Sequence, residues 1–515
     1  MNRLVFETQS VVLSSDPNRT DVACFIGFVG RRNTPLPANV RRWLEQGWAG
    51  ADLDALLNIP VLIDRWDLFD QLFAWDQRNY NNQGLQGATY LGAAVRSFFA
   101  QGGSRCYVVR VGDPWTAKTE RVDRLAQIKK LIPGYPERLE VAAIDRRSWA
   151  GIGHLFGLPD VSFVCLPDLP DAVQVQMPPV EEPEIAALEQ FVECSELAAP
   201  PLKNRVALSL QVPQCDAAGY ADWARAVHLV AELLVQSHRS TPSLREVQLV
   251  VAVPLPIPGV AVERNLLASM TGANPPLANH PRDHQDGIAS AFVQLVYPWV
   301  QTPGSLNLPQ QLESPDGVLV GILARTAITL GSFRSAASSH LADVQILSPV
   351  LTRDQLYQPY LDQPTATAAH HSLIERVSLL GATPAGLRLL SDVTTSLNEE
   401  YRLASVNRLV ALILRTARRL GEEYAFSASG ATLWSQMKTS LDRVLLGLFQ
   451  AGALWGKTAA EAFQVRCDRT TMTQSDLDNG RTIATVQFTA AMPIEQITLT
   501  LAMNEGGQLS LSRDH

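Results

Sequence analysis

The sequence predicts a multidomain chain of mixed α/β and α+β class, and three observations indicate it. The 515 residues are 46% hydrophobic and 18% charged, which suits several packed cores and excludes a disordered chain. Strand-like and helix-like segments alternate across residues 145–330, the pattern of α/β layering. Residues 401–515 instead read as helix, loop, helix, strand, loop, strand, strand.

The elements of the first two thirds follow from runs of apolar residues and from the turns between them. Residues 1–20 form an extended arm with apolar side chains at intervals. A Pro- and Glu-rich excursion at 170–202 separates the later elements from the earlier ones. Strands are predicted at 22–29, 60–63, 106–111, 160–166, 205–212 and 247–254, and helices at 68–75, 90–99 and 223–237.

The first C-terminal helix has two different faces. Its apolar face consists of Val406, Leu409, Val410, Ile413, Leu414, Ala417 and Leu420 at helical spacing. The opposite face carries Arg402, Arg408, Arg415, Arg418 and Arg419. Two interpretations stay open: a solvated helix surface, or a basic patch that grips an acidic partner through many weak contacts.

A second amphipathic helix and three strands complete the chain. The helix is built on Leu433, Trp434, Met437, Leu441, Val444, Leu445 and Leu448, and it stops near Gly452. The period then changes to the alternation of strands at 462–465, 483–488 and 494–501.

Charge and cysteine usage restrict the class of protein. The formal net charge of -8 argues against a nucleic-acid binder. The six cysteines lie mostly in apolar runs without C-x-x-C spacing, as expected of buried, reduced thiols. The N-terminus does not read as a signal peptide, and no apolar run reaches the ~18 residues of a membrane span. We therefore expect a cytoplasmic protein that contacts a membrane only through partners.

Three polar clusters suggest chemistry but fit structural roles better. His370 and His371, flanked by Asp362 and Glu375, are adjacent on a predicted helix, so their side chains diverge by about 100°. A loop cluster with no visible supporting shell contains His280, Asp283, His284 and Asp286. Charges at strand ends, which include Asp145, Asp168 and Asp171, are typical of turn caps and surface pairs.

No sequence motif indicates catalysis. The G-x-S-x-G, Walker A and H-E-x-x-H patterns are all missing from the sequence. We therefore predict a protein that is not an enzyme, with no catalytic residues, cofactor or metal.

Three ordered groups of residues carry a family resemblance. The first comprises Phe98, Phe99, Gly102, Gly103, Tyr107, Val108, Arg110 and Val111. The second comprises Tyr297, Pro298, Trp299, Pro315, Gly317, Gly321, Ala324, Arg325 and Thr326. The third comprises Leu433, Trp434, Gly452, Leu454, Gly456, Thr458, Glu461, Ala462, Phe463, Val465, Cys467, Asp468, Gly480, Pro493, Glu495 and Ile497. Together they resemble contractile tail sheath proteins of phages, R-type bacteriocins and contractile injection systems.

The resemblance implies a structural subunit of a contractile sheath. Such subunits stack as hexameric rings around an inner tube and change from an extended to a contracted lattice without nucleotide. The implied partners are further copies of the chain, the inner tube protein, and baseplate and cap proteins, with no nucleic acid and no direct membrane insertion. The implied particle is phage-tail-like, assembles in the cytoplasm, and is anchored to a membrane or released by partner proteins.

The resemblance also implies a tail-sheath-like fold, with a core formed by the N- and C-terminal parts and an inserted outer domain. The expected divisions are an arm at 1–20, core at 21–112, an inserted α/β outer domain at 113–290, a central segment at 291–400, and a C-terminal domain at 401–515. The arginine face becomes a candidate for tube contact. Candidates for strand exchange between neighbours are Leu4, Phe6, Val11, Ile497, Leu499 and Leu501.

The N-terminal arm departs from the family pattern. Sheath subunits commonly begin this arm with a P-G-V-Y-type segment, and this chain has LVFETQSVV there. One alternative is therefore a sheath-like ring next to the baseplate or cap. A second alternative, from a different class, is an α/β enzyme with its cleft near His280 and Asp283.

Overall fold

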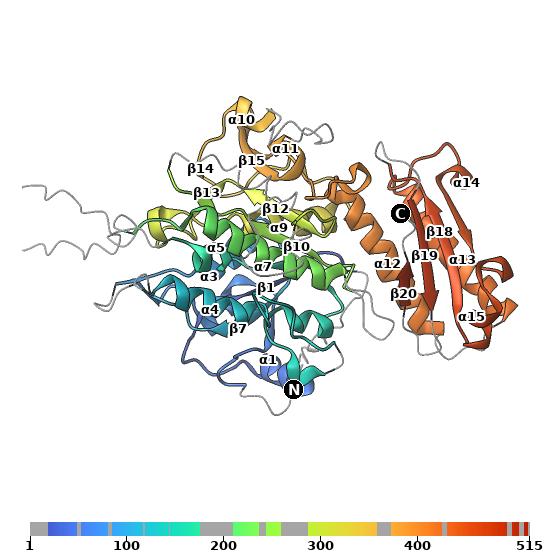
Figure 1. Ribbon diagram of the computed structural model, residues 1–515, viewed down its shortest axis with the longest axis horizontal. Coiled ribbons are helices and arrows are strands. Elements are labelled where there is room, and N and C mark those ends of the chain that lie inside the picture. Colours follow the sequence, from blue (N-terminus) through green and yellow to red (C-terminus); the bar gives the residue numbers. More distant parts are fainter. Residues whose placement is uncertain are drawn as a thin grey trace, which may run out of the picture.

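The computed structural model shows two bodies joined by a long helix (Figure 1). It describes residues 19–48, 53–80, 85–116, 119–143, 145–175, 210–235, 244–258, 287–357, 372–424, 430–491, 497–503 and 509–512. The larger body is built on one extended sheet. The smaller body, coloured red, is built on a second sheet, and the helix α12 (Ala404–Tyr424) lies between the two.

The large sheet has eight strands in the order β16-β15-β12-β10-β8-β1-β7-β3. The strands from β12 to β7 run parallel, β15 continues parallel to β12, and the outer strands β3 and β16 are antiparallel to their neighbours. Their bounds are β1 (Val22–Phe28), β3 (Pro60–Ile63), β7 (Cys106–Gly112), β8 (Val161–Cys165), β10 (Gln248–Ala252), β12 (Val293–Tyr297), β15 (Ser378–Thr383) and β16 (Gly386–Leu389).

Helices cover both faces of this sheet, since every residue of β1, β7, β8, β10 and β12 is buried. One group consists of α3 (Tyr90–Ala100) and α9 (Asp316–Thr329), which pack on each other and on β1. A second group consists of α4 (Arg121–Leu131), α5 (Leu169–Val173) and α7 (Ala217–Val235). The helix α3 starts where Thr89 accepts a hydrogen bond from the Gly92 backbone N–H.

The smaller body has a four-stranded antiparallel sheet in the order β17-β18-β19-β20. The strands are β17 (Phe463–Arg466), β18 (Thr482–Phe488), β19 (Ile497–Met503) and β20 (Leu509–Ser512). The helix α13 (Ala431–Gln450) packs on β17 and β18 and is followed by the short α14 (Ala459–Ala462) and α15 (Gln474–Asp478).

Shorter elements connect these layers. The strands are β2 (Gly30–Arg31), β4 (Phe73–Ala74), β5 (Arg78–Asn79), β6 (Gln86–Gly87), β9 (Gln214–Cys215), β11 (Leu255–Pro256), β13 (Trp299–Gln301) and β14 (Ile346–Ser348). The helices are α1 (Ala38–Trp48), α2 (Trp66–Leu72), α10 (Arg353–Tyr357) and α11 (Leu373–Arg376). Within the described ranges, short 3-10 helices lie at Arg146–Ser148, Gly151–Gly157, Pro309–Gln311, Glu399–Tyr401 and Arg469–Thr471.

The range 113–290, predicted as an inserted outer domain, contributes strands to the large sheet in its described part. The strands β8 and β10 come from that range, and they lie between β1 of the range 21–112 and β12 of the range 291–400. The cause is that parallel neighbours need long crossover connections, so one sheet can draw strands from distant parts of a chain. The last strand of the large sheet ends at Leu389, and the first strand of the smaller sheet begins at Phe463.

Candidate functional site

The helix α12 lies across the edge of the large sheet at which its parallel strands begin. Side chains of α12 bond to the backbone carbonyls of Arg19, Val161 and Ala291, which stand before or at the starts of β1, β8 and β12. Because strand ends leave polar backbone groups without ladder partners, this edge needs hydrogen-bond donors. The polar face of α12 supplies them.

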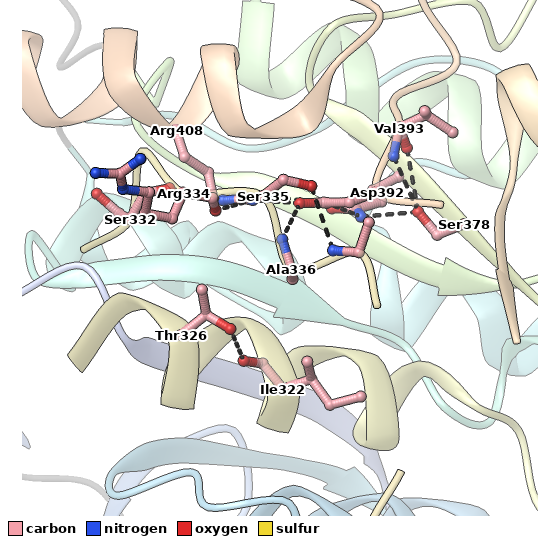
Figure 2. A network of polar contacts seen from close by, with 12 residues as sticks. Ile322, Thr326, Ser332, Arg334, Ser335, Ala336, Ser378, Asp392, Val393 and Arg408 are labelled. Atoms are coloured by element: carbon pink, nitrogen blue, oxygen red, sulfur yellow. Dashed lines mark hydrogen bonds and ion pairs between the residues drawn. The ribbon is translucent and has the colours of Figure 1, made fainter. Parts of the chain in front are cut away.

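Arg408 forms the first of two charged centres on this face. Its Nη2 lies 2.6 Å from Asp392 Oδ2 and its Nη1 lies 3.1 Å from Oδ1, a bidentate arrangement. The same guanidinium donates to the carbonyls of Ser332 and Arg334. Arg408 is 6% exposed and Asp392 is 3% exposed, so the pair is inside the protein. Figure 2 shows Arg408 reaching from its helix to this carboxylate.

Asp392 is held by more than one donor. Its carboxylate also accepts hydrogen bonds from the Ala336 backbone N–H at 2.8 Å and from the Gln294 amide at 2.9 Å. Burial by itself would raise the pKa of Asp392, but the Arg408 guanidinium and these donors outweigh it and leave the pKa below its ordinary value. The charged form of this carboxylate is therefore the stable one.

Arg415, two turns further along α12, forms the second centre. It donates to the carbonyls of Val161 at 2.8 Å, Asp160 at 3.2 Å, and Arg19. Its Nε lies 3.5 Å from Glu246, which also pairs with Arg418 at 2.8 Å. Burial raises the pKa of Glu246 and lowers that of Arg415, with their mutual attraction opposing both shifts. The partners of this centre thus offset the effect of burial less completely than those of Asp392 do.

Two of the five residues on the predicted arginine face are buried. Arg408 and Arg415 are ion-paired to the chain's own large body and have little surface to offer a tube. Arg402 precedes α12 and pairs with Glu399 at 3.1 Å. Arg418 is partly exposed and Arg419 is exposed. Tube contact by Arg402, Arg418 and Arg419 stays a prediction.

The strand-exchange candidates fall into two groups. Leu4, Phe6 and Val11 lie outside the described residues. Ile497, Leu499 and Leu501 lie in β19, opposite Phe488, Val486 and Ala484 of β18, and β20 pairs with the other side of β19. In the single chain β19 is therefore an inner strand. The two outer strands of this sheet are β17 and β20, and only outer strands have backbone groups free to pair with another chain.

The opposite edge of the large sheet, where the strands end, is filled by protein side chains. In doubly wound sheets ligands bind where the strand order reverses, which here is between β1 and β8. There the Phe28 backbone N–H donates to Asp168 at 2.7 Å, and Arg78 pairs with Asp171 at 2.8 Å. Burial raises the pKa of Asp168 to about 7. These aspartates are buried structural groups and not the surface pairs expected from the sequence.

The two histidine clusters considered as metal or catalytic sites fall mostly beyond the part of the chain that the structure describes. His280, Asp283, His284 and Asp286, and also Asp362, His370 and His371, lie outside the described residues. Glu375 is described and caps the start of α11. Among the described residues no cluster of three or more His, Cys, Asp or Glu side chains is arranged to hold a metal. In the same part of the chain, every helix is too short or too polar to span a membrane.

The cysteine prediction is confirmed for five of the six. Cys24, Cys106, Cys165, Cys215 and Cys467 are free and buried. Burial raises the pKa of each of these thiols, which keeps them protonated and unreactive at neutral pH.

The sequence did not point to the acidic partners on the large body. Glu246 stands just before β10, and Asp392 follows β16. Neither residue belongs to α12, so the periodicity of that helix gives no sign that they pair with it. The one available signal was the seven-residue spacing of Arg408 and Arg415, which places them on the same side of a helix.

Solved structures share this fold over nearly the whole chain. A chain of the anti-feeding prophage baseplate in the contracted state is 17% identical with a TM-score of 0.57, covering 96% of this chain and 95% of that one. A chain of the anti-feeding prophage helical sheath in the contracted state is 18% identical with a TM-score of 0.52, covering 95% and 98%. A chain of the contracted PVC sheath complex, an extracellular contractile injection system, is 15% identical with a TM-score of 0.51, covering 96% and 94%.

Comparisons of sequence alone find no match: no protein-family model matches the chain, and neither does any curated protein. With identities below 20%, the likeness to the solved chains is one of fold.

Proposed function

We propose that this chain, which has the fold of contractile sheath proteins, is a structural subunit of the sheath of a phage-tail-like contractile injection system. The observation that carries the proposal is the coverage: the shared fold extends over 95% of this chain and 98% of the helical sheath chain. A likeness confined to the α/β body would be weak support, because many functions occur on such sheets. Here both bodies are matched.

The subunits polymerise as stacked hexameric rings around an inner tube. A repeated head-to-tail contact that does not close produces an open helical filament. Contraction is a rigid-body rearrangement of subunits from a metastable packing to one of lower free energy, which drives the tube through a target envelope. The stroke needs no nucleotide and no catalytic residue.

Neighbouring subunits are joined through the sheet of the smaller body. The outer strand β17 lies beside a hollow of about 570 Å³ whose lining includes Leu446, Phe463 and Val465. The N-terminal arm of a neighbour, with Leu4, Phe6 and Val11, adds a strand at this edge. Main-chain hydrogen bonds between β17 and the arm then hold the subunits together, and the hollow beside β17 accepts every second side chain of the arm.

A second candidate is a sheath-like ring next to the baseplate of the same machine. It is favoured by the likeness to chains of baseplate structures, with TM-scores of 0.57 for the contracted baseplate and 0.53 for the 6-fold symmetrised one. Such a ring protein shares the fold of the subunit and differs in how many rings it forms.

Electron microscopy of the purified full chain, alone and with the inner tube protein, tests both candidates. A sheath subunit forms long tubes of stacked rings. A baseplate-proximal protein forms single rings, and persistent monomers under every condition would contradict both. A variant with Val465→Pro in β17 disrupts the docking edge and is expected to stop growth of tubes while the chain stays folded. The matched control is Val350→Pro, at an exposed position on the larger body.

A further inference from the structure

Arg415 connects the base of the N-terminal arm to α12. Its guanidinium donates to the carbonyl of Arg19, which lies at the end of the arm and is the first residue that the structure describes. The Arg19 side chain is itself fixed, with its Nη2 2.5 Å from Asp21 Oδ2 and 2.6 Å from Ser104 Oγ. The place where the arm leaves the sheet is therefore held by α12 on one side and by the sheet on the other.

The same helix contacts the other end of the chain. Besides α13, α12 packs against β20, the last described strand. It also contributes an apolar face that includes Leu409, Val410 and Ile413, all buried. The helix α12 thus contacts both the base of the N-terminal arm and the C-terminal strand β20. The strands β1 and β20 lie in different bodies (Figure 1).

Polar side chains line part of the contact between α12 and the large body. A cavity of about 20 Å³ lies beside Arg415 and Glu246, and the residues that line it include Ser162, Gln248 and Ser332. The hydroxyls of Ser162 and Ser332 and both polar atoms of the Gln248 amide are buried without a protein partner. A cavity of this size with several polar partners has room for one water molecule.

We propose that Arg415 is a coupling residue: it transmits a displacement of the N-terminal arm to α12, and through α12 to the C-terminal strand β20. Four groups converge on it, namely the Arg19, Asp160 and Val161 carbonyls and the Glu246 carboxylate. A guanidinium can serve all four because its donors are fixed in one plane. If arms are exchanged between subunits, which rests on the proposed function, a subunit senses a neighbour's movement at this residue.

Hydrogen exchange of the purified full chain tests the coupling without any assembly. Arg415→Lys keeps the charge beside Glu246, but its three donors are too few for the three carbonyls and the carboxylate together, and they do not have the fixed planar geometry of a guanidinium. We expect exchange to rise about tenfold, the equivalent of one lost charge-assisted hydrogen bond, at residues 19–22 and in α12 and β20 together. Exchange in β7 is expected to stay unchanged, which shows that the variant is folded. The matched control is Arg419→Lys, at an exposed position on the same helix.

The coupling must also work in the reverse direction, because coupling free energies are reciprocal. Asp21→Asn weakens the hold on Arg19 and is expected to speed exchange in α12, although Asp21 does not belong to that helix. Faster exchange confined to the arm base in Asp21→Asn, or to α12 in Arg415→Lys, would overturn the proposal. This outcome is independent of whether the chain forms tubes, so it leaves the sheath function untouched.

Discussion

At the scale of single residues, the Arg408–Asp392 pair makes a measurable contribution to stability. Asp392→Asn leaves the Arg408 guanidinium buried without its counter-charge, which costs about 3 kcal/mol of the free energy of unfolding. Urea unfolding measures this as a lower midpoint with an unchanged slope. Asp113→Asn is the control, because Asp113 is mostly exposed in its pair with Arg110 and should cost less than about 1 kcal/mol. Equal effects in the two variants would refute a buried role for Asp392.

Buried carboxyls on the larger body make stability depend on pH. Burial raises the pKa of Glu313 to about 8, although a hydrogen bond that the Ser97 hydroxyl donates to this carboxyl opposes the shift. Burial also raises the pKa of Asp316 to about 7. Their pKa in the unfolded chain is about 4. Between these values the folded state binds more protons than the unfolded state, so the free energy of unfolding falls as pH rises from about 4 towards 8.

Glu313→Gln is expected to make this decline shallower, because the amide keeps a hydrogen-bonding group but does not titrate. Thermal unfolding between pH 5 and pH 8, about the window set by these pKa values, measures the slope. Glu137→Gln, at an exposed position, is the control and should leave the slope as it is. An unaltered slope in Glu313→Gln would mean that this carboxyl does not bind the proton.

The arginines show what the sequence can and cannot specify about a residue. Their spacing correctly places Arg408 and Arg415 on one side of a helix, opposite the apolar side. Whether that side faces solvent, a partner or the chain's own sheet depends on Glu246 and Asp392, which are brought to α12 only by the tertiary fold. The burial of these charges could not be read from periodicity.

At the scale of elements, the tight packing of α3 on α9 depends on glycine. A Cβ atom on Gly317 would lie 2.2 Å from the Ala94 carbonyl oxygen, and one on Gly321 would lie 2.6 Å from the Phe98 carbonyl oxygen. Both neighbours are backbone atoms, which cannot move aside without moving the helix. These glycines, part of the second sequence block, are therefore packing positions.

Gly317→Ala is expected to destabilise the protein by about 1–3 kcal/mol, since overpacking forces the two helices apart. The control is Gly447→Ala on α13, where an added Cβ meets nothing within 4 Å. At that exposed helical position alanine should stabilise by up to about 1 kcal/mol. Denaturant unfolding compares the two variants. A neutral Gly317→Ala would contradict the close approach of the helices.

Elements with distinct hydrophobic patterns were predictable, and α9 shows the limit. The strands β1, β3 and β7 and the helices α3, α12 and α13 agree with their predicted ranges to within a few residues. The helix α9 is buried on nearly all sides, with ten of its residues from Asp316 to Thr326 inaccessible. A helix buried all round has no polar face and therefore no helical period to detect.

At the scale of the whole molecule, the order of the strands in the large sheet could not be predicted from the sequence. Adjacent β1 and β8 are separated by more than 130 residues, and no local pattern records which parallel strand lies beside which. The mixed α/β fold and the tail-sheath-like architecture were nevertheless predicted, through ordered blocks of residues, and the solved structures confirm the fold. Sequence blocks specify a family's fold without specifying the path of the chain through its sheet.

The most direct test of the account is a cryo-EM reconstruction of the purified chain assembled with the inner tube protein. The account predicts stacked rings in which each β17 edge is paired with the N-terminal arm of a neighbouring copy, and in which Arg408 and Arg415 face their own subunit's large sheet. A particle in which β17 is unpaired and copies meet only through their larger bodies would contradict it.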